Sequence, residues 1–130
     1  MTGGKVLDTS TLLSFANNRI SALLAIDAAD RAAQTVVVPA TALTSALVGV
    51  TPDQAESMDY LLDFGVVIID ELTRVTAPEV AATMTIASSP ADLAVAHAAY
   101  SARSRGWAVI TANARLWADT YPDIPTEQLP

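Results

Sequence analysis

Short apolar runs alternate with longer segments of helical periodicity along the whole chain. The apolar runs, which predict strands, are residues 5–8, 36–38, 66–69 and 107–111, with a short edge strand expected around Ile124. The intervening segments predict helices over residues 9–17, 19–33, 40–48, 52–64, 78–87, 89–104 and 113–120. This alternation predicts a three-layer α/β/α domain over residues 1–130, with a central parallel sheet of four to five strands. The strand at Lys5 to Asp8 is expected to be central.

Two of these runs have the composition of strands that are covered on both faces. Residues 36–38 are three valines, and residues 66–69 are two valines followed by two isoleucines. Parallel strands buried between two helical layers have such unbroken apolar sequences. In the helix expected over residues 19–33, Ile20 and Leu24 are among the apolar positions at helical spacing. We therefore expect them on its buried face.

The totals limit the classes of protein to which this chain can belong. The chain has 130 residues, of which 52% are apolar, enough for one domain with a sizeable core. It has no cysteine, so disulfides and thiolate metal sites are excluded. Its beginning lacks the apolar core of a signal peptide, and we expect a cytoplasmic protein with no membrane span. A net charge of −7 argues against non-specific binding of nucleic acid through overall charge.

Polar side chains stand where several predicted strands end and helices begin. Asp8 follows the first strand, Asn113 comes just after Thr111 at the end of another, and Asp92 stands at a helix start. Ligands bind at this edge of open parallel sheets, and oxygen ligands suit a hard divalent cation. Each residue also has a plainer explanation as a helix cap. In that alternative Asp8 and Asn113 are N-caps, and Asp92 is the acid at the third helical position (N3) of a capping box whose N-cap is Ser89.

Other polar residues give weaker indications of chemistry. His97 is the only histidine and stands in the middle of a predicted helix, which favours a structural role. Asp70 and Glu71 follow a strand, where a solvated loop is the common explanation. Arg103, Arg105 and Arg115 form either a local basic patch or, for the first two, a solvated helix end.

Four segments, taken in order, resemble the PIN domain family, and most closely its VapC-type toxin branch. Their order and spacing, and the total length, agree over nearly the whole chain. The segments are Val6 to Leu13, Val38 to Ser45, Asp92 to Ala99 with Gly106 after it, and Val109 to Arg115.

The resemblance implies a metal-dependent ribonuclease with an acidic cluster that binds Mg²⁺ or Mn²⁺. Asp8 matches the first acid of that cluster and Asp92 the third. The family places a glutamate where this chain has Ser45, and an aspartate where it has Asn113. The resemblance also implies a cognate antitoxin, an RNA substrate and a homodimer. Ser10 and Thr111 match polar residues that support the cluster.

The two replacements weaken the expected chemistry. Asp8 and Asp92 supply two negative charges, and Asn113 adds only a neutral oxygen. One weakly bound ion is compatible with this set, but a two-metal arrangement and a carboxylate base for the attacking water are not. We therefore expect a VapC-like protein with weakened or lost catalysis. The alternatives are a non-catalytic PIN-fold module that binds RNA or a protein, and a receiver-like signalling domain, which would need a lysine other than Lys5.

Overall fold

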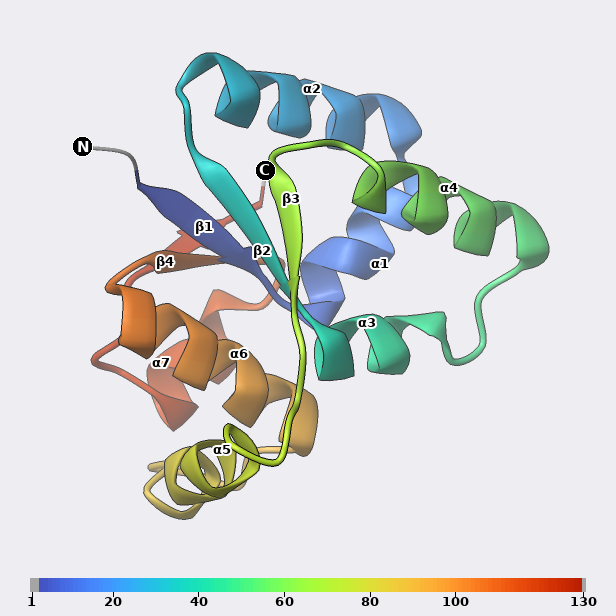
Figure 1. Cartoon of the computed structure of the whole chain (residues 1–130). Coiled ribbons are helices and arrows are strands. Elements are labelled where there is room, and N and C mark those ends of the chain that lie inside the picture. Colours follow the sequence, from blue (N-terminus) through green and yellow to red (C-terminus); the bar gives the residue numbers. More distant parts are fainter. Residues whose placement is uncertain (1–2, 130) are drawn as a thin grey trace.

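A computed structural model describes residues 3–129, which form a five-stranded, all-parallel sheet between helices (Figure 1). The strand order is β3-β2-β1-β4-β5, so β1 is central, as the sequence predicted. The three-layer α/β/α prediction is also confirmed. The strands are β1 (Gly4–Leu7), β2 (Thr35–Pro39), β3 (Val67–Asp70), β4 (Ala108–Thr111) and β5 (Thr126–Gln128).

Helices cover both faces of the sheet. Helices α1, α2 and α4 lie on one face, α6 and α7 lie on the other, and α5 packs against α6 (Figure 1). Helix α3 follows β2 directly and contacts both α1 and α6. The helices are α1 (Thr9–Asn17), α2 (Arg19–Arg31), α3 (Ala40–Leu47), α4 (Pro52–Leu62), α5 (Ala77–Thr85), α6 (Leu93–Arg105) and α7 (Ala114–Thr120).

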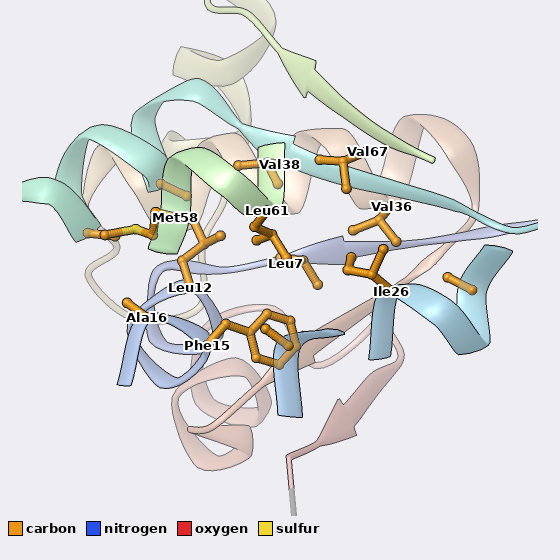
Figure 2. Packing of buried hydrophobic residues seen from close by; sticks show 14 of the residues in the cluster. Leu7, Leu12, Phe15, Ala16, Ile26, Val36, Val38, Met58, Leu61 and Val67 are labelled. Atoms are coloured by element: carbon orange, nitrogen blue, oxygen red, sulfur yellow. The ribbon is translucent and has the colours of Figure 1, made fainter. Parts of the chain in front are cut away.

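The two cores follow from the alternation of side chains along the strands. Leu7, Val36 and Val38 point toward α1, α2 and α4, where Figure 2 shows them with residues such as Leu12 and Met58. Side chains at the alternate positions of these strands point to the opposite face of the sheet. Val6, Val37 and Val109 pack against α6 and α7 in the second cluster. The sheet is therefore buried on both faces at its centre.

Four expectations about local structure are wrong. Strand β3 is not buried on both faces: Ile68 and Ile69 are 41% and 38% exposed, because β3 is an edge strand. On α2, Ile20 and Leu24 are 72% and 65% exposed, since the helix buries Ala22, Ile26 and Ala29 instead. The first residue of α6 is Leu93, so Asp92 is its N-cap and not the N3 acid of a capping box that begins at Ser89. The last strand also begins after Ile124, whose side chain is buried in the core.

Candidate functional site

The order of the strands creates a natural ligand-binding edge between β1 and β4. From β1 the chain proceeds to β2 and β3 on one side, and it then crosses back to β4 on the other side of β1. In open parallel sheets ligands bind at such a reversal, beyond the carboxyl ends of the strands. A pocket of about 210 Å³ lies there. Its lining includes Asp8, Ser10, Ser45, Asp92 and Asn113.

Asp8 is the most deeply placed acid of this pocket, with only 4% of its surface exposed. Its Oδ1 accepts hydrogen bonds from the Thr11 backbone N–H at 3.0 Å and from the Ser10 hydroxyl at 2.6 Å. Its Oδ2 accepts the indole N–H of Trp117 at 2.9 Å. Asp8 is therefore the N-cap of α1 and a member of the pocket lining at the same time.

Hydrogen bonds beside the pocket link the first turn of α1 to the end of β4. The Ser10 hydroxyl lies 3.3 Å from the Thr111 hydroxyl and accepts the Ala112 backbone N–H at 3.0 Å. Thr111 is fully buried, and its hydroxyl accepts the Asn113 backbone N–H at 2.9 Å. Thr111 thus supports the pocket from below and does not line it, whereas Ser10 does both.

Asp92, Asn113 and Ser45 are exposed in the pocket, and the first two lie at helix starts. Asp92 caps α6 by accepting the Val95 N–H at 2.8 Å on Oδ1, and none of the described residues donates to its Oδ2. Asn113 caps α7 by accepting the Leu116 N–H at 3.2 Å. Ser45, on α3, is exposed at the pocket. The capping explanation therefore holds for Asp8 and Asn113 as N-caps, Asp92 is an N-cap instead of a capping-box acid, and all three residues also meet in one pocket.

The donor atoms of the pocket suit a single, largely hydrated divalent cation. Among residues 3–129, one donor reaches Oδ2 of Asp8 and none reaches Oδ2 of Asp92. Asn113 and Ser45 add neutral oxygens, and oxygen atoms are the ligands that Mg²⁺ and Mn²⁺ prefer. Over residues 3–129 no group of three or more His, Cys, Asp or Glu side chains is close enough to hold a metal ion. Asp8, Asp92 and Asn113 would hold such an ion, with water completing its shell.

Trp117 does not line the pocket but donates a hydrogen bond to Asp8, and sequence reasoning missed it. It comes from α7, is completely buried and packs against Tyr121, while its N–H points at Asp8. Its place four residues after Asn113 puts it one helical turn further on. From sequence alone, a tryptophan in a short helix is interpreted as a core residue. Only the structure shows that its indole N–H donates to Asp8.

The comparisons with known proteins bear on the fold. The sequence matches no protein-family model and no curated protein. Among solved structures it is similar to the "Crystal structure of PAE2754 from Pyrobaculum aerophilum", with a TM-score of 0.62. This chain has the fold of PAE2754. The two are 18% identical, and the match covers 96% of this chain and 92% of PAE2754. At that identity PAE2754 establishes the architecture, and the chemistry must be argued from this chain's residues.

A second polar pocket lies at the end of β3. Asp70 receives two hydrogen bonds of 2.6 Å from the Arg105 guanidinium and one of 2.6 Å from the Ser101 hydroxyl. Nearby, His97 is almost fully buried, and its Nδ1 is 2.8 Å from the Thr41 hydroxyl of α3. The sequence interpretation of Asp70 and Arg105 as solvated residues is therefore wrong, because the two ends meet in a half-buried ion pair.

The pKa values in this second pocket follow from burial and pairing. Burial raises the pKa of the Asp70 carboxyl, but the hydrogen bonds from Arg105 and Ser101 and the charge of Arg105 outweigh burial, so its pKa is lowered overall. Burial lowers the pKa of His97, and the negative charge of Asp70 opposes this only in part. Asp70 is thus ionised and His97 neutral at neutral pH.

The arginines do not form a basic patch. Arg103 is paired with Asp123, and Arg105 with Asp70. Arg115 is largely exposed on α7 and lies 3.9 Å from Asp119. No helix among the described residues is long and apolar enough to cross a membrane.

Proposed function

We propose that this protein is a PIN-like, VapC-related ribonuclease whose cleavage is weakened or lost. The observation that supports this most directly is the pocket between β1 and β4, which Asp8, Asp92, Ser45 and Asn113 line together. The sequence resemblance expects an acidic cluster at these four positions, and two of them are neutral here.

The charge of the pocket accounts for the expected weakness. Asp8 and Asp92 supply two carboxylates, and protein donors already occupy three lone pairs of Asp8. A divalent cation held there would polarise a phosphodiester and lower the pKa of a bound water. Asn113 and Ser45 orient water or substrate as neutral groups. Neither can take a proton at neutral pH, so the pocket has no carboxylate at those positions to act as a general base.

One observation favours a second candidate, a non-catalytic PIN-fold module that binds RNA or a protein partner. The buried Asp8 carboxylate has hydrogen bonds on both oxygens, so its charge is stabilised without a cation. An RNA partner would have to bind despite the net charge of −7, through local contacts. A cognate antitoxin, a homodimer and a cytoplasmic location remain predictions from the resemblance and the sequence. The exposed Ile20 and Leu24 on α2 are compatible with a protein contact.

The test is cleavage of a mixed RNA pool by the unmodified protein, with Mg²⁺ or Mn²⁺ and with excess EDTA. We expect feeble, EDTA-sensitive cleavage, which Asp92→Asn removes. This variant is a matched control, because Asn is as good an N-cap as Asp and leaves α6 intact. Cleavage that EDTA or Asp92→Asn leaves unchanged would refute the metal-dependent proposal. Saturable RNA binding without any cleavage would favour the binding module.

A further inference from the structure

Trp117 contacts Asp8, and the neutral residues at Ser45 and Asn113 do not account for this contact. The indole N–H of Trp117 donates to Asp8 Oδ2 at 2.9 Å, and both side chains are buried. The other oxygen, Oδ1, already accepts two hydrogen bonds, from Ser10 and Thr11. A carboxylate has about four lone-pair positions, so one position, on Oδ2, remains open.

The orientation of Asp8 does not depend on Trp117. The Thr11 backbone N–H and the Ser10 hydroxyl both hold Oδ1, and the first of these is the N-cap contact of α1. A third donor on the opposite oxygen therefore adds little to the direction of the carboxylate. It draws negative charge from the oxygen that an incoming cation would have to contact.

We propose that the indole N–H of Trp117 takes the place of a cation at Asp8 and keeps the affinity of this pocket for divalent ions low. The inference rests on the proposed metal pocket and adds, to the neutral Ser45 and Asn113, a contact that weakens cation binding. The cation and the indole N–H compete for the charge of Asp8 Oδ2. Removing the N–H leaves a buried carboxylate with one partner fewer, and such a carboxylate binds a cation more readily.

The test is a titration with Mn²⁺ alone, followed by the loss of the electron paramagnetic resonance signal of the free ion. Two backgrounds are used, the natural protein and Ser45→Glu with Asn113→Asp. In each, Trp117→Phe is expected to raise the Mn²⁺ affinity about tenfold, a part of what a charge-assisted hydrogen bond contributes. The control is Trp107→Phe, because Trp107 is the other tryptophan and does not line the pocket. This variant should leave the Mn²⁺ affinity unchanged.

A second measurement needs no change at Trp117. With Trp107→Phe, one indole N–H resonance remains in a nitrogen–proton correlation spectrum. Saturating Mg²⁺ should move this resonance upfield, because the bond to Asp8 weakens, and Asp92→Asn should reduce the shift. A purely structural tryptophan would give no such response, and an unchanged resonance at saturating Mg²⁺ would overturn the inference even if Trp117→Phe fails to fold.

The outcomes separate this inference from the proposed function. If Trp117→Phe weakens Mn²⁺ binding or leaves it unchanged, the indole N–H does not compete with the cation for Asp8. The proposed metal pocket is not affected by that result. No Mn²⁺ binding in any variant, including Ser45→Glu with Asn113→Asp, refutes the proposed function and the inference together.

Discussion

Replacing Asp70 by Asn tests whether the ion pair at the end of β3 stabilises the fold. The variant keeps the shape of the side chain but removes its charge. Asp70 accepts three hydrogen bonds, two of them from Arg105, and the two side chains are 19% and 26% exposed. Exposed pairs contribute about 0–1 kcal/mol, and hydrogen bonds to charged groups about 1.5–3 kcal/mol. For a pair of intermediate exposure we expect a loss of about 2 kcal/mol.

That loss converts into a measurable shift of the melting temperature. With an unfolding entropy of about 2.1 cal/mol/K per residue, 130 residues give about 270 cal/mol/K, so Tm should fall by about 7 °C. The assay is urea unfolding at pH 7 followed by circular dichroism, with a thermal scan as a second readout. Asp27→Asn is the matched control, since the Asp27–Arg31 pair on α2 is mostly exposed and should cost little.

The same variant has a defined pH dependence. Because the pKa of Asp70 is lower in the folded state, its stabilisation is present above the unfolded pKa of about 3.9. It is lost as the pH falls through the lower, folded pKa. The difference between the natural protein and Asp70→Asn should therefore be present at pH 7, should rise slightly as His97 titrates without its attractive neighbour, and should shrink below about pH 4. A difference under about 0.5 kcal/mol at pH 7, or one that does not shrink below about pH 4, would refute this reasoning.

Two further predictions concern α6 and its neighbours. The pKa of His97, the only histidine, should lie below the ordinary value of about 6.5 when it is followed through the ring proton resonances. Asp70→Asn should lower this pKa further, because the variant removes an attractive negative charge. A higher pKa in the variant would contradict this. Gly106→Ala should cost about 1 kcal/mol in urea unfolding, because Gly106 ends α6 at a φ of +70°. Gly65→Ala, at a position with open space and no positive φ, is the control and should leave the free energy of unfolding unchanged. If both variants lose the same free energy of unfolding, the role of the left-handed conformation at Gly106 is refuted.

Most of the architecture could be predicted from the sequence because strands and helices have different periods. Residues 36–38 are apolar on both faces, which is typical of a central parallel strand, and that prediction is confirmed. The same reasoning failed for residues 66–69, because an apolar sequence does not say which strand lies at the edge. Edge position depends on the order of strands, which is a property of the whole chain.

The pocket residues at strand ends were visible in the sequence, but their contacts were not. Asp8, Asp92 and Asn113 could be selected because strand ends and helix starts can be recognised locally. Trp117 is 109 residues from Asp8 in sequence, and no local pattern indicates that its N–H reaches the carboxylate. For the same reason, Asp70 and Arg105, 35 residues apart, were assigned to solvent. Long-range polar pairing needs the fold to be known first.

The central claim is that this pocket has the arrangement of a ribonuclease site without its full charge. The most direct test is the rate of Mg²⁺-dependent RNA cleavage by Ser45→Glu with Asn113→Asp, compared with the natural protein. Asp at position 113 preserves the N-cap of α7, and position 45 is exposed, so the fold should tolerate both changes. We predict EDTA-sensitive cleavage well above that of the natural protein and of either single variant, and its loss when Asp92→Asn is added. Robust cleavage by the natural protein, or no gain in the folded double variant, would contradict the claim.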